Sequence, residues 1–279
     1  MDSLTKAKAK IAALTVILVC LRQTAPSCLP QRDLHSQATA ALLETKFPNP
    51  DISFLALDGS GKVVAERWPD SEHQLPIGSL IKPFLALAYG RTHQAYPEYV
   101  CVGKKTCWLN RGHGKVDIRK AIEFSCNSYF HQLVAGAQPG FAQDTLTAFG
   151  LDDTSQNDMS ILESRAVPLT LARAYLELAQ DRQEPAAQEV LQGMSLSAQH
   201  GTANAAGAEL GWMSPLAKTG TATCTHPNKA PGDGFAVVIA PSDHPHIVLL
   251  VRLHGRPGSM AAAVAGQMIA AIENRKAAR

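Results

Sequence analysis

The chain is 279 residues long, 46% of them hydrophobic and 18% charged, and its formal net charge is +2. A chain of this length and composition can bury one substantial core, which predicts one globular domain. Its basic residues are spread along the sequence without the interleaved aromatic residues that hold a phosphate backbone, so nucleic acid is excluded as a partner.

Residues 1–27 have the features of an export signal. Lysines near the start precede an apolar run from Ile11 to Leu21, and Ala25-Pro26-Ser27 offers a cleavage site of small residues. The run is about half of the ~20 residues that cross a bilayer, which favours a cleaved signal over a permanent anchor. We therefore expect residues 28–279 to be an extracytoplasmic domain, periplasmic or secreted, or held at the inner membrane if the segment stays uncleaved. Lipidation of Cys28 is a further alternative.

Hydrophobic periodicity and turn residues predict the elements that follow. A helix over 34–46 precedes two strands over 52–57 and 62–66, which Asp58-Gly59-Ser60-Gly61 joins as a hairpin. Helices are then predicted over 79–92, 117–124, 128–137, 142–149, 168–180 and 185–198. Strands return over 216–225, 235–240 and 247–253, before a helix over 259–275. This order predicts an α+β fold, in which an antiparallel five-stranded sheet flanked by helices carries an inserted helical lobe.

The cysteines in the middle of the chain raise the question of a disulfide bond. Cys101 and Cys107 flank a short polar segment, and export makes disulfide bonds durable, so we predict that these two residues pair. Two free thiols are the alternative. A metal site is disfavoured, because the sequence shows no second closely spaced pair that would complete a tetrahedral set. Cys126 has no evident histidine partner and is interpreted as a buried packing residue.

The first of three short motifs is Ser79-Leu80-Ile81-Lys82. A serine at a helix start has its backbone N–H among the unpaired donors of the first turn, and a lysine three residues later lies on the same face. This arrangement suits a nucleophile and its base, provided that burial and a second cation lower the pKa of the lysine. Taken alone, the motif favours a helix-capping serine and a solvated lysine, because S-x-x-K occurs by chance in many chains of this length.

The second motif, Ser125-Cys126-Asn127, falls between two predicted helices. A short loop there would present a hydroxyl and an amide side by side. Ser125 would pass a proton, and Asn127 would bind a substrate amide and orient Lys82. The alternative is a pair of residues that cap the two helices.

The third motif, Lys218-Thr219-Gly220-Thr221, lies in a predicted strand. Lys218 would be the second cation, Gly220 would let a ligand backbone approach, and the threonine hydroxyls would bind a terminal carboxylate. The backbone N–H of Thr221, opposite that of Ser79, would complete an oxyanion hole. As a bare tripeptide, Lys-Thr-Gly is equally at home in a turn.

The three motifs in this order resemble those of the penicillin-binding protein transpeptidases and serine β-lactamases, in which S-x-x-K, S-x-N and K-T-G define the site. The resemblance covers roughly residues 50–275. It includes several flanking blocks: Gly78 to Pro83, His113-Gly114, Ser125 to Phe130, Pro168 to Tyr175 and Gly201-Thr202-Ala203.

The resemblance implies a serine acyl-transferase that acts on D-Ala-D-Ala-ended peptidoglycan stem peptides as a D,D-transpeptidase or D,D-carboxypeptidase. β-Lactams would be its covalent inhibitors, cell-wall synthesis proteins its partners, and no metal or organic cofactor would be needed. Its catalytic residues would be Ser79, Lys82, Ser125 and Lys218, and its substrate-binding residues Asn127, Thr219, Gly220 and Thr221.

Three alternatives stay open. The short intervals between the motifs put cross-linking in doubt, so a D,D-carboxypeptidase or endopeptidase-like role is open. A β-lactamase would need a base that speeds deacylation, and no local pattern identifies one among Asp152, Asp153, Asp158 and Glu163. A non-catalytic sensor or scaffold would use the same pocket only to bind cell-wall peptides or β-lactams.

Overall fold

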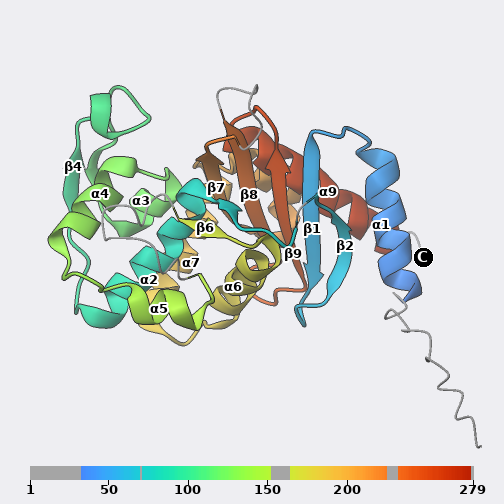
Figure 1. Ribbon diagram of the computed structural model, residues 1–279, viewed down its shortest axis with the longest axis horizontal. Coiled ribbons are helices and arrows are strands. Elements are labelled where there is room, and N and C mark those ends of the chain that lie inside the picture. The colour runs from blue at the N-terminus through green and yellow to red at the C-terminus, as the bar shows by residue number, and fades with distance from the viewer. Residues whose placement is uncertain (1–32, 70, 152–163, 225–231, 278–279) are drawn as a thin grey trace, which may run out of the picture. The chain divides into compact units, whose positions relative to one another are not determined.

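The computed structural model describes residues 33–69, 71–151, 164–224 and 232–277. Its central element is a five-stranded antiparallel sheet in the order β2-β1-β9-β8-β7 (Figure 1). The strands are β1 (Ile52–Asp58), β2 (Val63–Arg67), β7 (Leu216–Ala222), β8 (Asp233–Ala240) and β9 (Ile247–Leu253). Because β1 pairs directly with β9, the two ends of the domain share one sheet, and the predicted α+β fold is confirmed.

Both faces of this sheet are covered, which explains why every residue of β8 and β9 is buried. Side chains of these strands alternate between two cores: Val237 and Ile239 pack with the helical insertion, whereas Ala236 and Val238 pack with the terminal helices. The terminal side consists of α1 (Leu34–Lys46), α8 (Asn204–Leu210) and α9 (Gly258–Ala277), and α6 (Pro168–Gln180) contacts the opposite face. The sheet is therefore the middle layer between two groups of helices.

The helical insertion contains the segments that carry the first two motifs. It comprises the 3₁₀ turn η1 (Gly78–Ile81) and the helices α2 (Lys82–Thr92), α3 (Ile118–Glu123), α4 (Asn127–Gly136), α5 (Gln143–Ala148), α6 and α7 (Pro185–Gln199). Each helix predicted here is confirmed within a few residues. The structure adds α8, the 3₁₀ turns at Lys104–Thr106 and Gly211–Met213, and two short strand pairs, β3 (Leu75–Pro76) with β6 (Arg165–Ala166) and β4 (Tyr99–Cys101) with β5 (Gly114–Val116).

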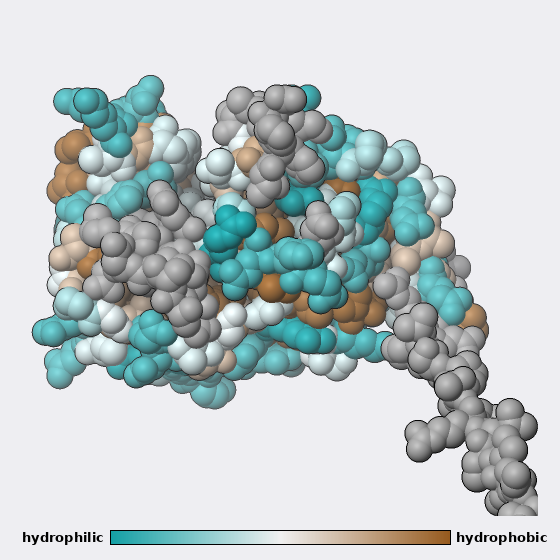
Figure 2. All heavy atoms as spheres, in the orientation of Figure 1, coloured by the Kyte–Doolittle hydropathy of each residue, from teal (hydrophilic) through white to brown (hydrophobic). Residues whose placement is uncertain are grey.

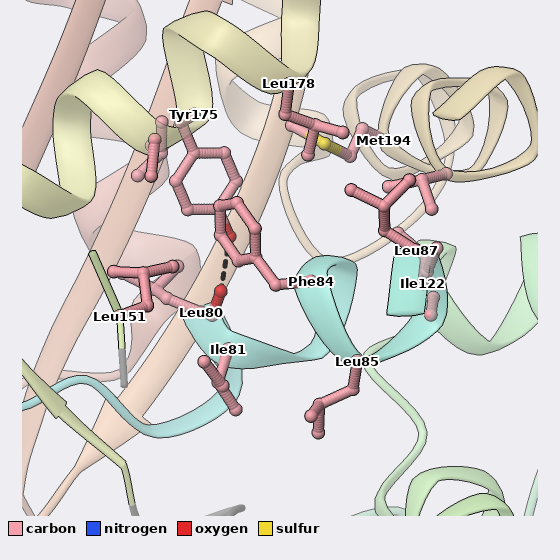
Figure 3. Close-up of a cluster of buried hydrophobic side chains, with 14 of the residues drawn as sticks. Leu80, Ile81, Phe84, Leu85, Leu87, Ile122, Leu151, Tyr175, Leu178 and Met194 are labelled. Atoms are coloured by element: carbon pink, nitrogen blue, oxygen red, sulfur yellow. Dashed lines mark hydrogen bonds between the residues drawn. The ribbon is translucent and has the colours of Figure 1, made fainter. Parts of the chain in front are cut away.

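A buried aromatic cluster holds the start of α2 against the rest of the insertion (Figure 3). The rings of Phe84 and Tyr175 pack edge to face with their centroids 5.0 Å apart. The Tyr175 hydroxyl donates a 2.7 Å hydrogen bond to the Leu80 carbonyl, and both groups are buried. Helix α6 thereby fixes the turn that carries Ser79.

Figure 2 shows hydrophobic residues in several places on this face, one of them the end of the molecule where β4 lies in Figure 1. Val100 in β4 and Val102 just after it are both largely exposed. None of the helices in the described residues is long and apolar enough to cross a membrane.

Candidate active site

Two glycines bring the first and third motifs together. Gly78 has a φ of +52°, and a Cβ there would lie 2.4 Å from the Thr221 carbonyl oxygen. A Cβ on Gly220 would lie 3.0 Å from the Ile77 carbonyl oxygen. The absence of side chains at these positions lets η1 lie close against β7, so Ser79 lies beside Gly220 and Thr221.

Lys82, three residues after Ser79, points into the protein and is only 3% exposed. Its ammonium nitrogen donates to the Ser125 carbonyl at 2.9 Å and to Asn127 Oδ1 at 2.5 Å. Burial lowers the pKa of Lys82 to about 7, although the nearby thiols of Cys126 and Cys107 act in the opposite direction. A substantial fraction of the molecules therefore holds this amine neutral near pH 7, as a base requires.

Lys218 on β7 is fully buried and approaches the same serine from the other side. Its Nζ donates to Ser125 Oγ at 2.8 Å and to the Thr219 carbonyl at 2.6 Å, while Lys82 Nζ lies 3.5 Å from Ser125 Oγ. Burial, and then the charge of Lys82, lower the pKa of Lys218 well below that of an ordinary lysine. The sequence argument expected burial and a second cation to lower the pKa of Lys82 together. In the structure burial lowers the pKa of Lys82, and the repulsion between the two lysines lowers the pKa of Lys218.

The second motif is a tight turn between α3 and α4. Ser125 has a φ of +49°, an unusual value for a residue with a side chain. Its N–H donates to the Ile122 carbonyl at the end of α3, and Asn127 begins α4. This strained turn directs Ser125 Oγ between the two lysines and Asn127 Oδ1 towards Lys82.

The predicted site residues surround one cavity of about 380 Å³. Its lining includes Ser79, Ser125, Asn127, Thr219, Gly220 and Thr221, together with Trp108, Gly201, Thr202, Asn204, Pro257, Gly258 and Ser259. The two buried lysines contact this lining through Ser125. All eight predicted catalytic and substrate-binding residues are thus brought together around one cavity.

Two residues of the cavity were missed as functional candidates. Thr202 receives a 2.7 Å hydrogen bond from the Thr219 hydroxyl, and its own N–H donates to the Glu123 carbonyl. Trp108 is 53% exposed and donates from its indole nitrogen to the Phe124 carbonyl. Thr202 lay in a block already noted for its resemblance, whereas a single tryptophan in a polar loop was the only signal for Trp108.

The predicted disulfide bond is not formed, since Cys101 and Cys107 are free thiols in the structure. Both sulfurs instead face His113 Nδ1, at 3.6 Å and 3.5 Å, and the Cys107 sulfur lies 3.9 Å from that of Cys126. Cys126 is buried, as predicted. The sequence argument against a metal site does not hold in the fold, because His113 and Cys126 are the second pair that local spacing could not reveal.

Several sequence predictions lie outside the described residues. They concern the signal segment 1–27, Cys28, and the acidic residues Asp152, Asp153, Asp158 and Glu163.

Comparison with known proteins agrees with this geometry. Residues 69–272 match the family model of the penicillin-binding protein transpeptidase domain. A search of curated proteins found no match. Among solved structures, penicillin-binding protein 2 of Pseudomonas aeruginosa is 19% identical with a TM-score of 0.69, covering 86% of this chain and 76% of that one. The transpeptidase domain of Burkholderia pseudomallei penicillin-binding protein 3 is 18% identical with a TM-score of 0.66, covering 86% and 92%.

A D,D-transpeptidase domain from Legionella pneumophila is 17% identical with a TM-score of 0.66, covering 88% of this chain and 98% of that one. At these identities the structures show a common fold, whereas the family model matches most of the chain and includes all three motifs. The chain therefore belongs to the penicillin-binding protein transpeptidase domain family.

Proposed function

We propose that this protein is a serine acyl-transferase that acts on D-Ala-D-Ala-ended peptidoglycan stem peptides through an acyl-enzyme on Ser79. The observation that carries the proposal is the buried Lys82, whose pKa is lowered to about 7 one helical turn from Ser79. Burying a lysine costs stability, so a lysine without a chemical role would be expected at the surface. A base that must be neutral near pH 7 requires it.

In the proposed acylation step, Ser79 Oγ forms a bond to the carbonyl carbon of the penultimate D-alanine, and the amide C–N bond breaks. Lys82 takes the Ser79 proton, and the Ser125 hydroxyl passes a proton to the leaving amine of the terminal D-alanine. The contact of Ser125 Oγ with both lysines supports this relay. Water or an amine then attacks the ester and releases Ser79.

Substrate binding is proposed for the β7 side of the cavity. The hydroxyls of Thr219 and Thr221 and the amine of Lys218 would hold the terminal carboxylate, and Asn127 would hold the stem-peptide amide. The Ser79 and Thr221 backbone N–H groups would stabilise the oxyanion. Transpeptidation and carboxypeptidation share this acyl-enzyme and differ only in the acceptor.

We further propose that residues 1–27 direct residues 28–279 across the cytoplasmic membrane. Peptidoglycan is available on the outer side of this membrane. Proteins of cell-wall synthesis are candidate partners. A solved Helicobacter pylori complex pairs a penicillin-binding protein with MreC, and the penicillin-binding protein of that complex is similar in fold to this chain.

Intact-mass analysis after incubation with benzylpenicillin tests the proposal. We expect one adduct per chain, mapped by peptide analysis to Ser79, that Ser79→Ala abolishes. Ser195→Ala, at a half-buried position of α7 that does not line the cavity, is the matched control and should acylate like the wild type.

An adduct on another residue, or none at saturating drug, contradicts the proposal. The adduct's lifetime then distinguishes the alternatives. A persistent adduct, together with release of D-alanine from a D-Ala-D-Ala peptide, supports the acyl-transferase. Rapid turnover of a chromogenic cephalosporin would identify a β-lactamase instead, and a persistent adduct without D-alanine release a sensor or scaffold.

A further inference from the structure

Four potential metal ligands from separate stretches of the insertion meet beside the second motif. We call this group the thiol–imidazole cluster; it consists of Cys101, Cys107, His113 and Cys126. One ligand atom from each residue lies within 4.8 Å of the others. The three cysteines are nearly inaccessible, with exposures of 2%, 7% and 0% in chain order.

Three of the six ligand-to-ligand distances within the cluster match those of a tetrahedral centre, and the other three are within 4.8 Å. Zinc bonds of about 2.3 Å to sulfur and about 2.0–2.1 Å to nitrogen, at tetrahedral angles, separate two sulfurs by about 3.8 Å and a sulfur from a nitrogen by about 3.5–3.6 Å. The Cys107 and Cys126 sulfurs are 3.9 Å apart, and His113 Nδ1 lies 3.5 Å and 3.6 Å from the sulfurs of Cys107 and Cys101. These are ligand-to-ligand separations for one ion at the centre.

The surroundings hold the ligands in this arrangement. The His113 ring lies between Trp108 and Phe124, with centroids 5.4 Å and 5.6 Å away, and this packing directs Nδ1 to the sulfurs. Backbone N–H groups of Leu109, Ser128 and Asn127 donate to the Cys107 sulfur. Such N–H donors also stabilise a metal-bound thiolate.

We propose that the thiol–imidazole cluster binds one Zn²⁺ ion. Three thiolates and one imidazole form the closed four-ligand set of a structural zinc site, in which no position is left open for water or substrate. Soft sulfur ligands disfavour magnesium and calcium, which take oxygen ligands. The ion replaces the thiol protons, and no oxidation or reduction is involved.

The position of Cys126 gives this site a role in the active site. Cys126 lies between Ser125 and Asn127, so a zinc–sulfur bond would fix the turn that presents the Ser125 hydroxyl and the Asn127 amide oxygen to Lys82. Cys107 directly precedes Trp108, which lines the cavity. The ion would therefore tie the loop between β4 and β5 to the second motif and act as a positioning element.

The experiment measures metal on the folded, reduced chain without any substrate, so its result is independent of the proposed reaction. We expect about one zinc per chain by elemental analysis, as a closed four-ligand site predicts. After removal of zinc, added Co²⁺ should give the intense near-ultraviolet absorption of thiolate-bound cobalt and the visible bands of a tetrahedral ion. Zinc should also protect three thiols from alkylation, and a chelator should expose them.

Cys101→Ser and Cys126→Ser should each weaken zinc binding by more than about tenfold, because each removes a ligand and the loss of an outer-shell partner alone costs about 10–100-fold. Cys224→Ser, which removes a thiol outside the cluster, is the matched control and should keep the zinc. Should a variant fail to fold, the cobalt spectrum and thiol protection of the wild type still test the site. The proposal is overturned by a reduced wild-type chain that binds no zinc, by zinc loss only in Cys224→Ser, or by a Cys101–Cys107 disulfide in place of bound metal.

Discussion

Ser125 is the side chain on which the two buried lysines converge. Its hydroxyl lies 2.8 Å from Lys218 Nζ and 3.5 Å from Lys82 Nζ, and its carbonyl accepts a further hydrogen bond from Lys82. Two buried amines that contact the same hydroxyl repel each other when both are protonated, so the doubly charged state is unfavourable. In the proposed acylation step, a proton removed from Ser79 would have a short route through Ser125 to the leaving group.

The protonation of Lys82 predicts the pH dependence of acylation. Because its pKa is lowered to about 7, the neutral, basic form grows as the pH rises through this value. The rate of acylation by a fluorescent penicillin should therefore increase from pH 6 to pH 8, with its midpoint at about 7. A rate that stays constant over this interval would mean that another group is the base.

Replacement of Lys82 by arginine separates a base from a fixed positive charge. A guanidinium retains its proton throughout this range, so Lys82→Arg should lower the acylation rate by about 10²–10⁴-fold, the usual contribution of a general base. Lys62→Arg, on the exposed hairpin before β2, should acylate normally. If Lys82→Arg acylates at a near-normal rate, Lys82 acts only as a fixed positive charge and another group is the base.

At the scale of elements, the close packing of η1 on β7 depends on Gly78. A side chain there would adopt the left-handed conformation, at a cost of about 1–2 kcal/mol, and would also meet the Thr221 carbonyl. Gly78→Ala should push η1 away from β7 and reduce acylation by about 10²-fold, the effect of a displacement of about 1 Å.

Gly140 provides the matched control for that variant. Its φ is +76°, but a Cβ would meet nothing within 4 Å. Gly140→Ala should lower the free energy of unfolding by the left-handed strain alone, about 1–2 kcal/mol by denaturant unfolding, and keep its acylation rate. If both variants acylate equally well, the contact between η1 and β7 does not position Ser79.

The elements that sequence patterns predicted are those that local signals define. Strands β1 and β2 are short runs rich in apolar residues on either side of a glycine-rich turn, and α6 begins at Pro168 with a strongly amphipathic pattern. Strands β3 and β6 have two residues each and pair across the insertion, so no periodicity could show them. Helix α8 was missed because it is short and Ala203 before it provides no side-chain cap.

The candidate site also has parts that local sequence reveals and parts that only the fold brings together. Each motif was visible as a short string, and the resemblance supplied the order that ties the strings together. The thiol–imidazole cluster was not visible, because His113 and Cys126 meet Cys101 and Cys107 only after the β4–β5 hairpin folds back on α4. The sequence showed only that Cys101 and Cys107 are close in the chain, which favoured a disulfide bond between them.

At the scale of the whole molecule, the sheet is the fixed frame between two cores. The core on the terminal side contains α1, α8 and α9, and the core on the other side contains the insertion with η1 and α2. Strand β7, at the edge of the sheet, carries the third motif to the boundary between sheet and insertion. The cavity therefore lies where two separately packed layers meet, which lets buried charges face a solvent-accessible pocket.

Those buried charges should make the stability of the whole chain depend on pH in a defined direction. The pKa of Lys82 is about 7 in the folded protein and near its ordinary value of 10.5 in the unfolded chain, so between these values the unfolded chain binds more protons. The wild-type free energy of unfolding should then gain up to about 1.4 kcal/mol per pH unit from this group as the pH rises. Below pH 7 the cost of burying the lysine is present in full, and above about pH 10.5 it disappears.

Lys82→Met removes that titration while keeping the buried volume. Its stability relative to the wild type, measured by urea unfolding at each pH, should therefore fall by about 2–4 kcal/mol between pH 7 and pH 10. Lys62→Met removes an exposed lysine whose pKa is raised by Asp33, and its stability relative to the wild type should show no such fall. A pH-independent difference for Lys82→Met would mean that Lys82 titrates normally in the folded protein, and the neutral base on which acylation depends would be lost with it.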